Sequence, residues 1–174
     1  MRRDPVALAP ETVNHVTYHA TGSDVFAIDD HDRDAIVAFL GKTVQRYQLD
    51  LHDYCVMTNH IHLVVRAPHG NLPRAMQHFL SGVVLRFNRR HGRRGHLVQE
   101  PYAPKPILSE EHYLSTRAYV AMNPVEANLV SHPRDYRWCG FGGGGVLTPR
   151  PDATIRALVE AQLELRKMRL ATLG

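Results

Sequence analysis

The sequence predicts an α+β fold in which helices pack on a mainly antiparallel sheet. Residues 51–57 and 60–65 are two short, largely apolar segments around a turn, which is typical of a hairpin. Residues 32–47 and 71–90 flank this hairpin and repeat apolar side chains at helical spacing. With a strand over 14–19, the order strand, helix, hairpin, helix, strand favours one domain of sheet and helices.

The first helix is expected over about 32–47, because its apolar side chains fall on one face. These side chains are Ile36, Phe39, Leu40, Val44 and Tyr47. The hairpin follows, with Thr58 and Asn59 as turn formers.

The second strand of the hairpin carries His60 and His62. Successive side chains of a strand point to opposite faces, so the two imidazoles share one face and Ile61 and Leu63 share the other. Two imidazoles on a rigid strand could bind a metal ion. The alternative is a pair of half-buried, hydrogen-bonded histidines.

The second helix is expected from an N-cap at Asn71 to about Arg90. A short strand near Leu97 and Val98 is then expected to close the sheet. The proline-rich segment 101–106 excludes a helix or a central strand.

A third helix should begin at Ser109 and end near Asn123, since Pro124 discourages continuation. Tyr119 and Asn123 lie four positions apart and therefore share one helical face. A nucleophile and a metal ligand could share that face. A core tyrosine and an ordinary helix terminator are the alternatives.

Five arginines lie close together without an acidic residue among them: Arg86, Arg89, Arg90, Arg93 and Arg94. Guanidinium groups bind phosphates with paired hydrogen bonds, so the block favours a polyanionic partner. A solvated helix end capped by Gly92 is the alternative.

Composition is that of a compact domain, with 174 residues of which 44% are hydrophobic. The sequence has no apolar run long enough for a membrane span and no apolar secretory segment at its start, so we expect a cytoplasmic location and no membrane partner. Cys55 and Cys139 form no Cys-x-x-Cys pair and are expected in the core.

Residues 142–174 are expected to form a glycine linker and a C-terminal amphipathic helix, capped by Asp152. The apolar residues of this helix are Ile155, Leu158, Val159, Leu163, Leu165 and Met168. Packing against its own domain is expected, with a dimer contact or a gate over the active site as alternatives. The sequence is compatible with a monomer and with a homodimer.

Four sequence blocks follow one another along residues 14–141: His15-Val16-Thr17, 54–63 (YCVMTNHIHL), 87–97 (FNRRHGRRGHL) and 119–130 (YVAMNPVEANLV). In content and order they resemble the HUH single-tyrosine transposases, the insertion-sequence 200-like family. The resemblance is strongest to the branch associated with repetitive extragenic palindromes (REP). It assigns residues 10–141 to one transposase domain with a ferredoxin-like or RRM-like HUH fold.

The resemblance also implies an activity. His60 and His62 would be metal ligands, Asn123 a third, polar ligand, and Tyr119 the nucleophile. With Mg²⁺ or Mn²⁺, such a protein cleaves and rejoins single-stranded DNA that carries a hairpin or palindromic repeat, through a 5′-phosphotyrosine intermediate. The location would then be cytoplasmic and nucleoid-associated.

DNA contacts are expected from the arginine block and from Tyr102, which could stack on a base. The sequence departs from the family where Gln99-Glu100-Pro101-Tyr102-Ala103 replaces the usual Gln-Gly-Arg, aromatic residue and Lys, and where His19 precedes Ala20-Thr21-Gly22 instead of Arg-Gly. A domesticated protein that binds structured single-stranded DNA without cutting it is therefore the main alternative. A relaxase or replication initiator, or a small metal-binding α+β protein, are further alternatives.

Overall fold

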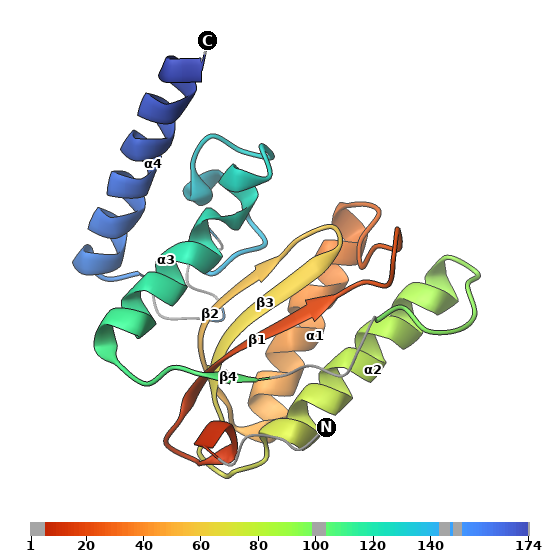
Figure 1. The fold of residues 1–174 in the computed structure, drawn as a ribbon. Helices are drawn as coiled ribbons and strands as arrows, with labels where there is room; N and C mark the ends of the chain where they lie inside the picture. Colours follow the sequence, from red (N-terminus) through yellow and green to blue (C-terminus); the bar gives the residue numbers. More distant parts are fainter. Residues whose placement is uncertain (1–5, 99–103, 143–146, 148–150, 174) are drawn as a thin grey trace.

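The computed structural model describes residues 6–98, 104–142, 147 and 151–173. Within them, one antiparallel sheet of four strands carries helices on both faces, as the sequence predicted (Figure 1). The strand order is β2 (Asp50–Val56), β3 (His60–Arg66), β1 (Val13–His19) and β4 (Lys105–Pro106). Helices α1 (Asp30–Tyr47) and α2 (Leu72–Arg90) cover one face, and α3 (Glu110–Glu126) covers the other. Two 3₁₀ turns, Val6–Leu8 and Pro133–Asp135, complete this part of the chain.

The register between β1 and β3 decides which side chains share a face. Thr17 pairs with His62 and His19 pairs with His60. Directly paired residues of antiparallel strands point to the same side. These four side chains therefore lie on the α3 side of the sheet, whereas Val16, Tyr18, Ile61, Leu63 and Val65 enter the core beneath α1 and α2.

Helices α1 and α2 pack closely at Gly82. A Cβ atom at this position would lie 2.0 Å from the Phe39 ring, so only glycine lets the ring sit against α2. The Tyr18 hydroxyl, buried in the same core, donates to the Met76 carbonyl at 3.3 Å.

The ends of these helices follow local capping rules with two differences. Helix α1 begins earlier than predicted, because Asp29 is its N-cap and accepts from the Asp32 amide at 3.0 Å. Asn71 precedes α2 as predicted, but its side chain donates to the Tyr47 carbonyl instead of capping the helix. Gly92 follows the C-cap with a φ of 61°, which confirms its predicted role as C′ residue.

Helix α3 begins at the predicted cap, where the Ser109 hydroxyl accepts from the His112 amide at 3.1 Å. The predicted end near Asn123 is wrong, because the helix continues through Pro124 to Glu126. Proline in a helix removes its own amide hydrogen bond, and its ring crowds the carbonyl four residues earlier. Burial of Pro124 and Val125, together with the bond from the Leu129 amide to the Pro124 carbonyl at 2.9 Å, keeps the last turn helical.

The predicted fourth strand near Leu97 and Val98 is also misplaced. Val98 makes only an isolated bridge with Ala20, and the fourth strand is Lys105–Pro106. Its position at the sheet edge accommodates a proline, because an edge strand needs amide donors on one side only.

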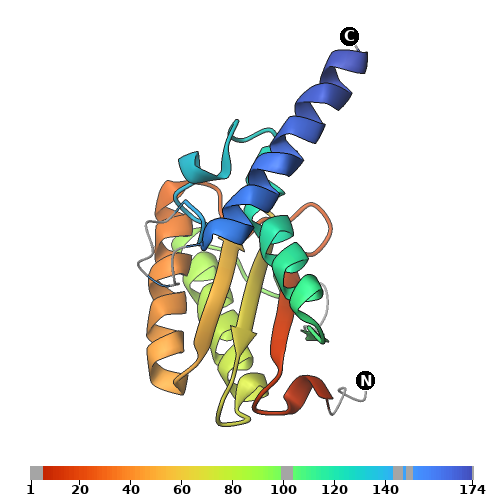
Figure 2. The same cartoon turned by 90° about the vertical axis from the view of Figure 1, so that its left-hand side faces the viewer.

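Helix α4 (Ala153–Leu173) begins after Asp152, whose side chain accepts from the Ile155 amide at 2.9 Å. It packs on α3, away from the sheet, as the expected contact with its own domain. Val159 and Leu163 are buried against Ala118, Ala121, Met122 and Val125. The last turns project beyond the rest of the molecule (Figures 1 and 2), and Leu165 and Met168 are exposed there.

The start of the predicted glycine linker is tightly packed. A Cβ atom on Gly142 would lie 2.3 Å from the Tyr136 carbonyl oxygen, and the Gly140 amide donates to the Tyr54 carbonyl at 2.8 Å. The following three glycines, residues 143–145, lie outside the described residues. Cys55 and Cys139 are buried free thiols, as expected. Within the described ranges, no helix has both the length and the apolar character needed to cross a membrane.

A buried polar network joins α3 to β2. Arg117 on α3 lies 3.3 Å from the Asp53 carboxylate on β2, and both side chains are almost fully buried. The Tyr113 hydroxyl contacts Arg117 at 3.2 Å and His52 at 2.8 Å. Burial raises the pKa of Asp53 to about 6, although the Arg117 charge opposes this shift.

We predict that Asp53 lowers the free energy of unfolding as pH rises. Its folded pKa lies above the unfolded value of about 3.9, so the stability that it contributes is complete below that value and is lost as pH rises through about 6. From pH 4 to pH 7, the free energy of unfolding of Asp53→Asn should therefore rise by on the order of 2 kcal/mol relative to that of wild type. Urea unfolding at both pH values measures this change. Asp50→Asn, at a half-exposed carboxylate of the same strand, is the control; equal pH dependence of the two variants would contradict the prediction.

Candidate active site

Three elements converge on the α3 side of the sheet. Strand β3 supplies His60 and His62, and α3 supplies Tyr119 and Asn123. Together with residues of β1, they line an open hollow of about 940 Å³. All four side chains that the sequence analysis selected for chemistry thus lie in one place.

His62 is held through one ring nitrogen and leaves the other without a partner. Its Nδ1 lies 3.0 Å from Nε2 of His15 and 3.2 Å from the Thr17 hydroxyl. Its Nε2 is buried and has no hydrogen-bond partner. Buried polar atoms nearly always have partners, so this nitrogen indicates a ligand position.

His60 faces two amide oxygens. Its Nε2 lies 3.1 Å from Oδ1 of Asn123, and its Nδ1 lies 2.8 Å from Oδ1 of Asn59. The Asn123 amide group donates to the Tyr119 carbonyl at 2.9 Å, which fixes the orientation of its oxygen toward His60. A neutral imidazole has one N–H and can donate to only one of the two oxygens.

Burial keeps these imidazoles neutral. Desolvation lowers the pKa of His60, and it lowers the pKa of His62 to about 3 with help from the neighbouring histidines. The pKa of His15 falls to about 4, mainly through burial and then through the nearby Lys105. Neutral imidazole is the form that binds a metal ion.

The residues present fit a divalent metal. The free Nε2 of His62, the Nε2 of His60 and the oxygen of Asn123 are two imidazole donors and one amide oxygen on residues that line the same hollow. No three His, Cys, Asp or Glu side chains of the described chain are arranged to hold a metal. Asn123 is therefore the residue that could complete the set.

Tyr119 is exposed beside the histidines. Its side chain is 52% exposed, and its ring centre lies 5.6 Å from that of His62 and 6.1 Å from that of His15 in edge-on orientation. A tyrosine placed for core packing would be buried. Asn123 is not a helix terminator either, because α3 continues past it.

Other residues of the hollow were not selected as site residues from the sequence. They are His15, Thr17, His19, Lys105, His112, Ser115 and Thr116. The alternation of polar side chains at 15, 17 and 19 matches that of His60 and His62 and is the signal that could have found the first three. Lys105, at the sheet edge, and α3 residues such as His112 depend on tertiary placement.

The arginine block lies on and just after α2, which covers the opposite face of the sheet (Figure 1). Two of its members are tied to acidic residues near the start of α1. Arg90 pairs with Asp29 and Asp32, and Arg93 pairs with Asp24 at 2.9 Å. The other three, Arg86, Arg89 and Arg94, are exposed and pair with no described carboxylate. Tyr102 lies outside the described residues.

Comparisons with known proteins identify a family and a similar fold. Comparison with the curated proteins finds no match. A solved structure described as a REP-associated tyrosine transposase bound to a REP hairpin is similar in fold, with a TM-score of 0.67 and 15% identity over 86% of this chain and 87% of the other. Residues 13–123 match the family described as "Transposase IS200 like". This matched region holds both histidines, Tyr119 and Asn123, and the chain therefore belongs to the IS200-like transposase family.

Proposed function

We propose that this protein cleaves and rejoins single-stranded, hairpin-bearing DNA through a covalent bond between Tyr119 and a 5′-phosphate. One observation carries the proposal: an exposed tyrosine stands over two neutral histidines and an amide oxygen in a single open hollow. Membership in a family of transposases supports it. The hairpin in the similar structure supports the choice of DNA substrate.

The reaction exchanges one phosphodiester for another. The Tyr119 oxygen forms a bond to phosphorus, the bond from phosphorus to the 3′ oxygen breaks, and the phenolic proton passes in net terms to that leaving oxygen. Bond energy is conserved, so attack by a 3′-hydroxyl on the phosphotyrosine rejoins the strand. The same tyrosine can thus cut and reseal without an external energy source.

Tyrosine is a poor nucleophile at neutral pH. A free tyrosine side chain in water has a pKa near 10, so forming its phenolate at pH 7 costs roughly 4 kcal/mol. Positive charge beside the scissile phosphate must offset this cost. Lys105 lines the hollow and can supply part of this positive charge.

His60, His62 and Asn123 would hold a divalent ion, Mg²⁺ or Mn²⁺, which supplies Lewis-acid stabilisation of the phosphate when bound. The chain orients this set through its own contacts. His15 and Thr17 hold Nδ1 of His62, so that Nε2 faces the hollow. Asn123 is bonded to the Tyr119 carbonyl, which couples the amide oxygen to the backbone of the nucleophile.

We predict that Tyr119→Phe abolishes a covalent protein–DNA adduct, because it removes the nucleophilic oxygen. Wild type, incubated with end-labelled hairpin-bearing single-stranded DNA and Mn²⁺ or Mg²⁺, should give a slow-migrating band on a denaturing gel. Oligonucleotides from the flanks of the protein's own coding region are suitable substrates. Tyr47→Phe, at a tyrosine of α1 on the other side of the sheet, is the control and should react as wild type.

An adduct in Tyr119→Phe would overturn the assignment of the nucleophile. DNA binding by wild type, without adduct or cleavage on any of these substrates, would overturn the proposed enzyme. It would favour a domesticated protein that binds structured single-stranded DNA.

We also predict that His62→Ala weakens Mn²⁺ binding by more than about tenfold, since loss of an outer partner of a ligand alone costs about 10–100-fold. The variant removes the imidazole whose Nε2 has no protein partner. Isothermal titration calorimetry of the DNA-free protein at neutral pH measures the affinity. His69→Ala changes an exposed histidine beyond the end of β3 and is the matched control. Equal affinities of the two variants would exclude His62 as a ligand.

A further inference from the structure

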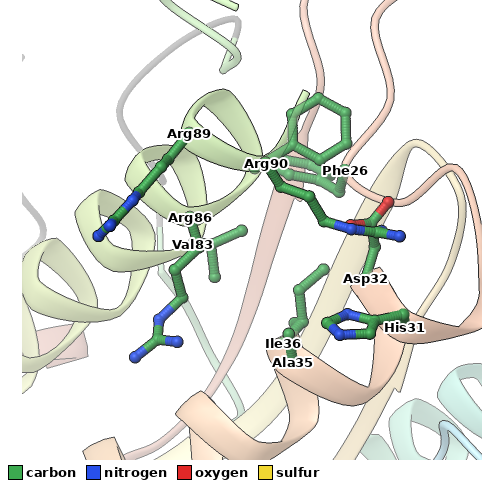
Figure 3. Close-up of a pocket in the computed structure, with 10 residues that line it drawn as sticks. Phe26, His31, Asp32, Ala35, Ile36, Val83, Arg86, Arg89 and Arg90 are labelled. Atoms are coloured by element: carbon green, nitrogen blue, oxygen red, sulfur yellow. The ribbon is translucent and has the colours of Figure 1, made fainter. Parts of the chain in front are cut away.

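A hollow of about 500 Å³ lies between α1 and α2 (Figure 3). Its floor is apolar and consists of the buried side chains Phe26, Ile36, Val83 and Phe87. Arg86 and Arg89 also line it. The hollow therefore combines an apolar surface with cationic groups.

A second hollow of about 490 Å³ lies on the neighbouring surface of α2. Phe39, His78 and the exposed Leu85 contribute to its lining. Arg86 and Arg89 line both hollows, and the Arg86 guanidinium lies 4.9 Å from the centre of the Phe39 ring. Two cations thus stand between two largely apolar depressions.

The charge of these two arginines is not neutralised by any described carboxylate. Figure 3 shows Arg90 pointing toward Asp32, whereas Arg86 and Arg89 point away from it. Asp32 is the one acidic residue of the described chain that lines the first hollow, and it is paired with Arg90 and with His91. Both hollows are therefore positively charged.

We propose that this surface binds single-stranded DNA, with a base in each hollow and two phosphates of the adjoining backbone on Arg86 and Arg89. Single strands present unpaired aromatic bases beside a charged backbone, and they bind where apolar or aromatic surfaces alternate with cations. A duplex keeps its bases stacked inside and cannot fill the hollows. The proposal rests on the proposed function for the nature of the ligand.

This surface is distinct from the active site, because α2 and Tyr119 lie on opposite faces of the sheet. The nucleotides bound there flank the hairpin and are not the ones that Tyr119 attacks. The surface therefore adds affinity for longer strands.

The test is fluorescence anisotropy with an oligothymidine of about 20 nucleotides, longer than the roughly 4–16 nucleotides that one single-strand site covers. The double variant Arg86→Gln/Arg89→Gln should reduce the slope of log affinity against log salt concentration by about 1.4, which is about 0.7 for each lost phosphate contact. If the affinities converge at 1 M salt, binding at 0.1 M falls about 25-fold. Arg74→Gln, at an exposed arginine in the first turn of α2 that lines neither hollow, is the control.

Two further comparisons separate binding in the hollows from general attraction to charge. Ala35→Leu narrows the first hollow without changing charge and should weaken binding while the salt slope stays the same. An oligonucleotide with abasic sites keeps the phosphates and should bind wild type more weakly than oligothymidine. Equal affinity of the abasic strand, or equal losses in the double variant and in Arg74→Gln, would overturn the proposal.

Adduct formation on a short hairpin substrate keeps this test independent of the proposed function. Failure of wild type to form any adduct would count against the transposase reaction, whereas oligothymidine binding would still decide on the surface.

Discussion

The pairing of β1 with β3 is the constraint on which the candidate active site depends. It places Thr17 opposite His62 and His19 opposite His60, so that one strand orients the histidines of the other. Slippage by a single residue would turn every side chain of a strand to the other face. The apolar residues that alternate with the histidines prevent it, because Ile61 and Leu63 are fully buried beneath α1 and α2. The core therefore fixes the geometry of the hollow on the opposite face.

The second requirement is the position of α3. Helix α3 packs against α4 through small or flexible side chains, such as Ala118, Ala121 and Met122. Such side chains define the register of a helix only weakly. The buried pair of Arg117 and Asp53 is directional, since either charge left alone in the core is costly. The network therefore ties α3, and with it Tyr119, to the strand next to β3. The exposed position of Tyr119 beside two histidines does not itself stabilise the fold.

Four arginines of the block form two structural groups. Arg90 and Arg93 join the end of α2 to the loop and cap before α1, and their charges are balanced by Asp24, Asp29 and Asp32. Arg86 and Arg89 keep their charges beside apolar hollows. A count of positive residues in the sequence cannot separate these groups, because the balancing acids lie about 60 to 70 positions away along the chain.

Features that depend on neighbouring residues could be predicted from the sequence alone. Alternation along a strand placed His60 and His62 on one face of the sheet. Helical spacing placed Tyr119 and Asn123 on one face of a helix. Ser109 and Gly92 marked helix ends. Features that depend on distant partners were decided only in the tertiary structure. Burial carried α3 through Pro124, edge position allowed a strand at Pro106, and strand pairing brought His15 to His62. The physical reason is range: propensity and periodicity act within a few residues, whereas pairing, burial and charge balance join segments that meet only after the chain has folded.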